Sequence, residues 1–523
     1  MKISFKNYTT LESIDTNVLV EFLTEDYVKK FFEVNGKCVC GPDCKCGEKC
    51  NCDKCPLQEA IYEFDFKGKK LETAVVSSQT KNFDKIIFIG LGKEEKLTKI
   101  TAEEIGYKTF KYLKSNKIKN ASIAFNITIN KKQQFDFVRE NIDLYSSFVF
   151  GFSVAEYNFT KYFTDDKLKN KEISVKDVVF ITSKPKDLEK TFEDNVIIKD
   201  NVFFCRDLVN EPSNVIYPDT YIKIAKDLEK FGVGVEIIDK KQMKKLGMDA
   251  LLSVNQGSDN DPYLVVLKWE GAEKNDKPLA FVGKGVTFDS GGLSLKPSSA
   301  MEEMKIDMAG SAVVLSLIRL LAQRKAKVNA VGIMPLVENM PSGHAIKVGD
   351  IVKSMSGQTI EIMNTDAEGR VILADALYYV ATKFNPEIII DLATLTGAIM
   401  VALGDDYAGL FTNNSDLFKE LKEAGESTNE KVWRMPLSEL DGFYDKQIDS
   451  DFADVRNTGK TRDGGSITAA QFLQRFINNH KKWAHIDIAS TAYVKQEHFL
   501  TPKNATGYGV RLLNELIKNN YEK

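Results

Sequence analysis

The chain has 523 residues, of which 43% are hydrophobic and 28% are charged, and its formal net charge at pH 7 is -3. This length exceeds what one hydrophobic core normally supports, so at least two domains are expected, and the composition excludes a mainly disordered chain. The near-neutral charge gives no support for binding to nucleic acid or to an anionic membrane.

The first third of the chain predicts a small α/β domain. Residues 85–92 read as a strand that ends in a glycine turn, 101–115 as an amphipathic helix and 121–127 as another strand. Apart from its cysteines, this part holds no cluster of residue types that carry catalysis.

A charged connector over residues 183–195 is expected to lead into a helix over 196–214 that ends before Pro212. We therefore place 1–184 in a small N-terminal α/β domain. Residues 185–523 are then a linker helix and a larger C-terminal domain.

The C-terminal part alternates strands with helices, which predicts a mostly parallel central sheet flanked by helices. The expected strands are 263–269, 279–283, 328–334 and 387–391, and the expected helices are 302–321 and 371–383.

Seven of the eight cysteines lie in the cysteine-rich segment, residues 37–55: Cys38, Cys40, Cys44, Cys46, Cys50, Cys52 and Cys55. The odd count and the C-x-C spacing favour thiolate binding of Zn or Cu, in a pattern that resembles metallothionein, over a disulfide framework. A passive, redox-sensitive insert is the alternative. Cys205 stands apart and is expected to be a buried small hydrophobe.

The N-terminal residues show no apolar secretory signal, and the longest apolar run, 387–404, is too short and too polar to span a membrane. We therefore expect a cytoplasmic protein.

Two acid-rich stretches carry the candidate chemistry. In an extended segment Asp366, Glu368 and Arg370 would share one face, because side chains alternate along a strand. The second stretch, 281–310, also follows a predicted strand, where ligands bind in open α/β sheets. It presents Lys284, Asp289, Lys296 and Asp307 around a Gly-Gly loop.

Carboxylates gathered at the edge of a core would repel one another unless cations neutralise them. The chain has four histidines, so oxygen ligands for Mn, Mg, Zn or Co are favoured, and bridging carboxylates permit two ions. From spacing alone, an equally good reading makes the acids helix caps or solvated turns. Asp307 would then complement a helix dipole, and Lys284 and Lys296 would be surface lysines.

The run NTDAEGRVILADAL, residues 364–377, resembles the signature of the cytosol (leucyl) aminopeptidase family. Further blocks are similar in order and spacing from about residue 200 onward. They are 208-LVNEPSN-214, 283-GKGVTFDSGGLSLKP-297, 304-MKIDMAGSAVVL-315, 338-ENMPSGHAIKVGD-350, 391-DLATLTGA-398 and 504-NATGYGVRLL-513.

The resemblance implies a two-metal leucyl-type aminopeptidase, a hydrolase that removes N-terminal residues from peptides through a metal-bridged water. It implies that Asp289 and Glu368 bridge two divalent ions, Mn or Zn with Mg or Co as alternatives. Asp366 would complete one metal site, and Lys284 with Asp307 the other.

By the same resemblance, Lys296 would stabilise the oxyanion and Arg370 would hold bicarbonate as an auxiliary base. The pocket for the N-terminal side chain, Leu, Met or similar, would include Met304, Thr394, Leu395 and Gly397. The resemblance also implies a homohexamer. Ser490 stands where glycine would be expected.

Two rival functions remain at this point. In a two-metal phosphoesterase Lys284, Lys296 and Arg370 would bind phosphate. In a metal-storage protein the cysteine-rich segment would be the functional part, beside a degenerate peptidase domain.

Overall fold

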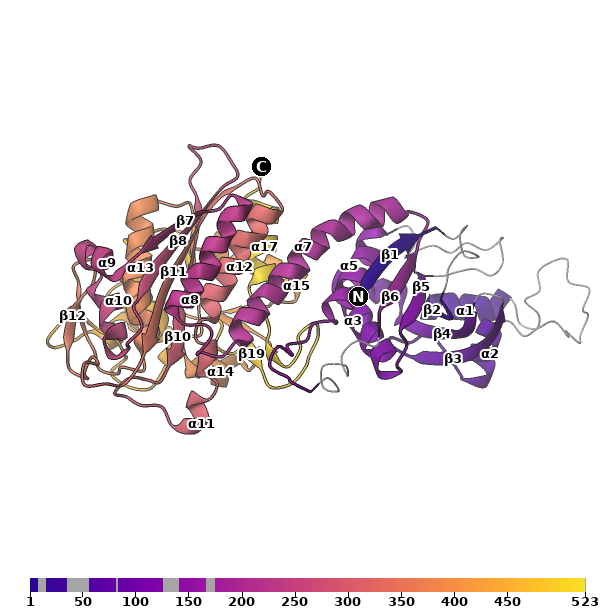
Figure 1. Cartoon of the computed structure of the whole chain (residues 1–523), viewed down its shortest axis with the longest axis horizontal. Coiled ribbons are helices and arrows are strands. Elements are labelled where there is room, and N and C mark those ends of the chain that lie inside the picture. The colour runs from indigo at the N-terminus through magenta and orange to yellow at the C-terminus, as the bar shows by residue number, and fades with distance from the viewer. Residues whose placement is uncertain (8–15, 35–55, 81–82, 126–140, 166–174, 523) are drawn as a thin grey trace, which may run out of the picture. The chain divides into compact units, whose positions relative to one another are not determined.

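The computed structural model in Figure 1 describes residues 1–7, 16–34, 56–80, 83–125, 141–165 and 175–522. They form two compact units, Met1–Lys199 and Asp200–Lys523. The cysteine-rich segment lies outside the described residues. Cys205 is buried, and burial raises the pKa of its thiol to about 12.

In its described part, the N-terminal unit is a six-stranded sheet with the order β1-β6-β5-β2-β4-β3, in which only the pair β3 and β4 is antiparallel. The strands are β1 (Lys2–Lys6), β2 (Val18–Thr24), β3 (Thr73–Thr80), β4 (Phe83–Gly92), β5 (Asn120–Phe125) and β6 (Asp177–Ile181). The helices are α1 (Glu25–Val34), α2 (Pro56–Glu63), α3 (Lys99–Ser115) and α5 (Ile142–Val154). The predicted strands over 85–92 and 121–125 and the helix over 101–115 are confirmed; residues 126 and 127 are not described.

The predicted connector over 183–195 was wrong, because the segment belongs to a single helix, α7 (Pro185–Asn210). The division between the two units falls within α7, at residues 199 and 200. Leu188 is buried while Lys186, Asp187, Glu189 and Lys190 are exposed, so the charges occupy the solvent side of a helix. α7 ends before Pro212, as expected.

The C-terminal unit contains a nine-stranded sheet in the described residues, with the order β16-β15-β18-β14-β9-β11-β8-β7 and β10 paired to β11. Its central strands β18, β14, β9 and β11 are mutually parallel, which confirms the predicted mostly parallel sheet. The bounds are β7 (Gly234–Ile238), β8 (Tyr263–Glu270), β9 (Leu279–Gly283), β10 (Gly285–Asp289), β11 (Asn329–Asn339), β14 (Ile389–Ala393), β15 (Ala408–Thr412), β16 (Val432–Arg434) and β18 (Trp483–Asp487).

Smaller strands lie outside this sheet: β12 (Ile351–Lys353), β13 (Thr359–Glu361), β17 (Val455–Arg456), β19 (Tyr493–Val494) and β20 (Asn504–Ala505). The helices of the unit are α8 (Pro218–Lys226), α9 (Lys240–Leu246), α10 (Asp249–Val254), α11 (Ser298–Met301), α12 (Ala309–Gln323), α13 (Glu368–Phe384), α14 (Gly397–Leu403), α15 (Ser415–Thr428), α16 (Gly465–Gln474) and α17 (Val510–Asn520).

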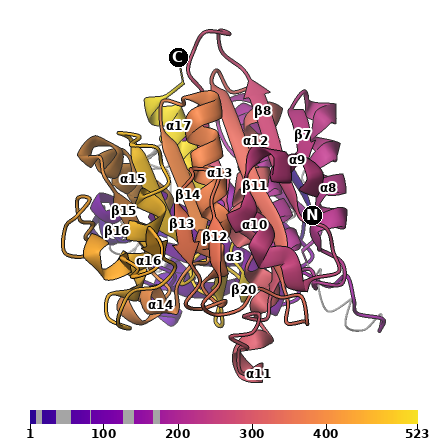
Figure 2. The same ribbon diagram turned by 90° about the vertical axis from the view of Figure 1, so that its left-hand side faces the viewer.

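Helices cover both faces of the central strands. A Cβ at Gly332 would touch Val314 and Ile318, so one face of β11 lies against α12. The neighbouring Val331 and Ile333 point the other way, into a core shared with α13. Figures 1 and 2 show α10 and α13 on one side of these strands and α12 on the other.

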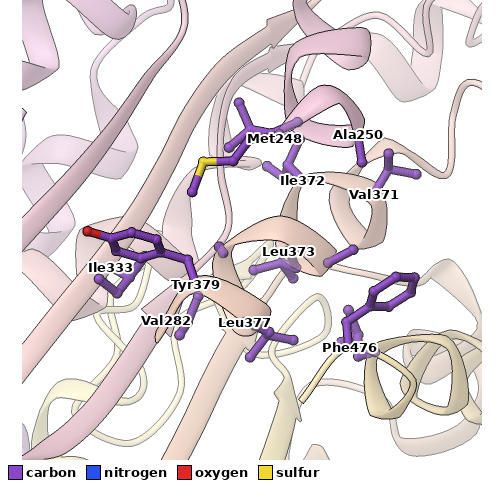
Figure 3. Close-up of a cluster of buried hydrophobic side chains, with 14 of the residues drawn as sticks. Met248, Ala250, Val282, Ile333, Val371, Ile372, Leu373, Leu377, Tyr379 and Phe476 are labelled. Carbon is purple, nitrogen blue, oxygen red and sulfur yellow. The ribbon is translucent and has the colours of Figure 1, made fainter. Parts of the chain in front are cut away.

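The core between α13 and the sheet is apolar and closely packed. Figure 3 shows Val282 and Ile333 of the sheet beside Leu373, Leu377 and Tyr379 of α13, all of them buried. This packing fixes the position of α13 and so of Glu368 in its first turn.

Two helix predictions need correction. The helix expected over 302–321 begins only at Ala309, with α12, and is preceded by a short 3-10 turn over Met304–Ile306 (η5), so Asp307 lies between these two elements. The second helix begins at Glu368 rather than 371, so Glu368 and Arg370 lie in the first turn of α13. The prediction that Asp366, Glu368 and Arg370 share one face of an extended segment was therefore wrong.

Among the described residues, one stretch, Ser298–Gln323, is long and apolar enough to cross a membrane by length and composition. It includes the break before α12, and 89% of its most apolar window is buried inside the unit.

Candidate active site

The candidate residues meet at the carboxyl ends of the parallel strands. Lys284 follows β9, Asp289 ends β10, Thr394 follows β14 and Asp487 ends β18. Because β9, β14 and β18 are adjacent and parallel, these ends lie along one edge of the sheet.

Lys284 lies at the centre of the buried part of the site. Its Nζ is 2.7 Å from Asp307 Oδ1 and 2.8 Å from Glu368 Oε1, and it donates to the Thr394 carbonyl oxygen at 3.0 Å. Burial alone would lower the pKa of Lys284, but the charges of Asp307 and Glu368, with a smaller contribution from Asp289, raise it above its usual value. The lysine thus neutralises carboxylates that would otherwise be buried without a cation.

Lys296 occupies the equivalent position on the more open side. Its Nζ forms ion pairs with Asp289 Oδ2 at 2.8 Å and with Asp366 Oδ1. Asp289 Oδ1 also accepts hydrogen bonds from the Gly291 amide, 2.9 Å, and from Asn339 Nδ2, 2.8 Å. Burial, reinforced by the charge of Glu368, raises the pKa of Asp289 to about 6 against the opposing lysines.

These acids fit divalent cations. Carboxylate oxygens of Asp289, Asp366 and Glu368 lie within 4.8 Å of one another, so one ion could contact all three. Asp307 Oδ2 is buried and accepts no hydrogen bond from the part of the chain that the structure describes, while burial raises the pKa of its carboxyl well above the usual range. Oxygen ligands of this kind suit Mn, Mg and Zn.

Arg370 is a candidate for binding an anion instead of a cation. Its Nη1 donates to the Asn457 carbonyl oxygen at 2.8 Å, and its buried Nε has no hydrogen-bond partner among the described residues. Burial lowers the pKa of Arg370 to about 10, although the charges of Glu368 and Asp487 oppose the shift. The orphaned Nε leaves a donor for an anion.

The predicted pocket residues differ in their burial. Thr394 is buried beside the acids, and its Oγ1 donates to Asp307 Oδ1 at 2.7 Å. Leu395 packs against the apolar core, and Gly397 is exposed at the start of α14 with no atom within 4 Å of an added Cβ. Met304 is half-buried in η5, three residues before Asp307.

Sequence reasoning missed two asparagines, Asn339 and Asn457, which form hydrogen bonds to the segments that carry Asp289 and Asp366. Asn339, which ends β11, donates to Asp289 and to the Thr365 carbonyl oxygen at 3.0 Å. Asn457 accepts from the amides of Met363 and Asn364 at 2.8 and 3.3 Å and donates to the Asn364 carbonyl oxygen at 2.7 Å. A signal for Asn339 was present, since it belongs to the block 338–350.

Ser490, which stands where glycine was expected, is buried with its hydroxyl hydrogen-bonded. Its Oγ donates to the Tyr407 carbonyl oxygen at 3.1 Å. The hydroxyl therefore adds a link from the end of β18 to the residue before β15.

Both units match models of one protein family. The cytosol aminopeptidase family catalytic domain matches residues 203–514, and the N-terminal domain of the same family matches residues 52–166.

Curated relatives that match most of the chain agree with this family match. A probable cytosol aminopeptidase of Rhodopseudomonas palustris (strain TIE-1) is 54% identical over 372 residues, 71% of this chain and 73% of the relative. A probable cytosol aminopeptidase of Phytoplasma australiense is 48% identical over 435 residues, 83% of this chain and 85% of the relative.

Solved structures agree as well. A mutant of tomato leucine aminopeptidase has a TM-score of 0.80 and 31% identity, covering 99% of this chain and 97% of its own. The bottromycin maturation enzyme BotP in complex with Mn has a TM-score of 0.77 and 26% identity, covering 96% and 99%. With both units matched and the acids gathered at the sheet edge, the chain belongs to the cytosol aminopeptidase family and is a metal-dependent exopeptidase that hydrolyses peptides from the N-terminus.

Proposed function

We propose that the protein is a two-metal, leucyl-type aminopeptidase that prefers N-terminal Leu, Met and similar residues. The observation that carries the proposal is the group of Asp289, Asp366 and Glu368 within 4.8 Å, with Lys284 and Asp307 directly beside it. Asp289 and Glu368 would bridge the ions, Asp366 would complete one site, and Lys284 with Asp307 would complete the other.

When bound, two divalent ions would activate a water held between them and polarise the scissile carbonyl. Mn or Zn is proposed, with Mg or Co as alternatives. Lys284 would contribute its free amine, because nearby divalent charge opposes the ammonium form.

The remaining polar residues would act on the substrate. Lys296 carries its charge on the more open side of the acids, where it would stabilise the oxyanion that forms during hydrolysis. Arg370 would hold a bicarbonate ion as auxiliary base, for which its Nε is available. A base near the acids would take the proton of the attacking water.

The loop after β14 would hold the substrate. The carbonyl oxygen of Leu395 would accept a hydrogen bond from a substrate N–H, while Thr394, Gly397 and Met304 would border the pocket for the N-terminal side chain. Shape and apolar contact in such a pocket set the preference for Leu or Met.

The test is hydrolysis of leucine amide after chelation and readdition of Mn, Zn, Co or Mg separately, with N-acetyl-leucine amide as the control. We expect metal to restore activity on the free amine and none on the blocked substrate. Hydrolysis of the blocked substrate, or none with any ion, would refute the proposal. Activity on a phosphodiester instead would favour the phosphoesterase.

A second test addresses the ligands themselves. Asp366→Asn and Glu368→Gln should each remove nearly all turnover and weaken metal retention, with the fold preserved by circular dichroism. Wild-type turnover by either variant at saturating metal would contradict the ligand assignment.

We further propose a cytoplasmic location, which is supported by relatives that are named cytosol aminopeptidases. We also propose a homohexamer, which is what the resemblance to the family implies. Light scattering after gel filtration would give the mass of the assembly.

For the cysteine-rich segment, we propose Zn or Cu binding independent of catalysis. Deleting residues 38–55 should reduce thiol-dependent metal retention and leave peptidase activity unchanged.

A further inference from the structure

Asp487 is a buried carboxylate outside the proposed metal-binding and catalytic sets. It ends β18 with no exposed surface. Its Oδ1 accepts from the amides of Leu395, 3.1 Å, and Ala489, 3.2 Å, and its Oδ2 accepts from Thr396 Oγ1 at 2.6 Å. Two of the three donors belong to the loop between β14 and α14.

That loop is fixed at both ends. On one side, Thr394 contacts Lys284 through its carbonyl oxygen and Asp307 through its hydroxyl. On the other side, Asp487 holds Leu395 and Thr396. Thr396 Oγ1 also accepts from the Ile399 amide at 3.2 Å and so caps α14. The Leu395 peptide lies between the two anchors, so its carbonyl can take few directions.

Further polar contacts join β14 and β18, the strand that ends at Asp487. Asp391 of β14 is paired in register with His485 of β18, and its carboxylate contacts His485 Nδ1 at 2.6 Å and Trp483 Nε1 at 2.8 Å. All these side chains are buried. Burial raises the pKa of Asp487, and the charge of His485 opposes that shift.

We propose that Asp487 is a positioning residue, which sets substrate selectivity by fixing the Leu395–Thr396 segment and, with it, Thr394 and Gly397, the residues on either side that would border the pocket for the N-terminal side chain. This rests on the proposed function, because that function assigns the segment to the substrate. Asp487 acts through backbone amides and a hydroxyl and does not itself contact substrate.

The hydrogen bonds define which substitutions separate this role from a charge effect. In Asp487→Asn, the amide oxygen can still accept from Leu395 and Ala489, and the new NH₂ can donate to Thr396, whose hydroxyl also accepts. In Asp487→Leu, of similar size, all three donors lose their acceptor. Thr396→Val removes one bond to Asp487 and the cap of α14.

The experiment measures kcat and KM for leucine amide and glycine amide on metal-loaded enzyme, with metal content and thermal unfolding beside them. For Asp487→Leu we expect the ratio of kcat/KM for leucine over glycine to fall about tenfold, since apolar pockets discriminate by roughly 10–200-fold per methylene-sized group. The loss should appear mainly as a higher KM for leucine amide, with metal content unchanged. Asp487→Asn should stay within about threefold of wild type, because it keeps the oxygen that accepts from the Leu395 and Ala489 amides and can still form a hydrogen bond with Thr396.

An unchanged leucine-to-glycine ratio in Asp487→Leu would overturn the proposal. So would an equal loss in Asp487→Asn, which would point to charge instead of position. If Asp487→Leu fails to fold, Thr396→Val decides: a lowered ratio supports the proposal and an unchanged ratio overturns it.

Hydrogen exchange gives a readout that does not depend on activity. The Leu395 amide should exchange faster in Asp487→Leu than in Asp487→Asn or wild type, and equal rates would overturn the proposal. If wild-type protein does not hydrolyse leucine amide with any metal, the proposed function fails, and the exchange rates still judge whether Asp487 positions the loop.

Discussion

Lys296 is the residue whose chemistry can be separated most clearly from metal binding. Its Nζ contacts two acids, yet its side chain is less buried than that of Lys284, 14% against 4% exposed. In the proposed role, its ammonium group would stabilise the negative charge that forms on the substrate oxygen only after attack on the carbonyl. Lys296→Met should therefore lower kcat about 10²–10³-fold with a smaller change in KM.

The control for this prediction is Lys347→Met, because the Lys347 side chain is 70% exposed and forms an ion pair with Asp350, which is not among the candidate site residues. It should leave kcat and KM unchanged in the same assay. A Lys296→Met enzyme whose loss is confined to KM would show that the lysine binds substrate instead of stabilising the oxyanion.

Asp375 shows how one buried acid makes stability depend on pH. It lies in α13, and its oxygens accept from the amides of Leu251, 2.8 Å, and Met355, 2.7 Å. Burial raises the pKa of Asp375 to about 7, although these hydrogen bonds oppose the shift. At pH values between 3.8, the usual pKa of an aspartate, and about 7, the Asp375 carboxyl is ionised in the unfolded chain and protonated in the folded chain.

Asp375 should thus contribute stability that is present at low pH and lost as the pH rises through this window, by up to about 1.4 kcal/mol per pH unit. Asp375→Asn should remove that contribution. Urea unfolding of both proteins from pH 4.5 to 7.5 checks it, because the difference between their unfolding free energies should change with pH. Parallel curves would show that Asp375 ionises in the folded protein as it does in the unfolded chain.

At the scale of elements, the close crossing of α12 over the sheet is the feature most sensitive to added volume. A Cβ at Gly310 would lie 2.1 Å from the Leu392 carbonyl oxygen of β14. Gly310→Ala must push α12 away from the strand, and we expect a loss of about 1–3 kcal/mol in unfolding free energy. Gly343→Ala is the matched control, since an added Cβ there meets nothing within 4 Å.

Denaturant unfolding of the two alanine variants makes the comparison. Gly343→Ala should stay within about 0.5 kcal/mol of wild type. Equal stability of both variants would mean that α12 can shift without cost.

The elements that sequence periodicity predicted are those with strong local patterns. β8, β9, β4 and α3 have apolar runs or alternation that a short window detects. Glu368 and Arg370 were misread because over five residues a period of two and the first turn of a helix look alike. The connector was misread because charge on one side of a helix resembles charge in a loop.

The candidate site residues also divide into those that a local sequence pattern identifies and those that it does not. The acids and lysines were found because they lie in sequence blocks with recognisable motifs. Asn457 and Asp487 were missed as contributors because their partners are 93 and 92 residues away in the chain, at Asn364 and Leu395. No local pattern records such a contact, so only the folded sheet shows it.

At the scale of the whole molecule, metal binding and stability should be linked. Cations that bind the folded site and not the unfolded chain stabilise the fold by mass action, about 2.7 kcal/mol at a hundredfold excess over Kd. Chelation should therefore lower the unfolding temperature, and Mn or Zn should restore it. Differential scanning fluorimetry measures this, and Glu368→Gln should show a smaller shift. Equal shifts of the unfolding temperature in wild type and Glu368→Gln would show that the stabilising ion binds at a different site.

The order of strands in the C-terminal sheet has a consequence for synthesis. β18 lies between β14 and β15, although it follows both of them in the chain, and Asp487 at its end accepts a hydrogen bond from the loop after β14. During synthesis β14 and β15 therefore leave the ribosome before the strand that separates them in the sheet, and the sheet cannot be completed until β18 has emerged. Hydrolytic activity should therefore appear only after β18 has been made, and nascent chains that stop before it should carry no working peptidase.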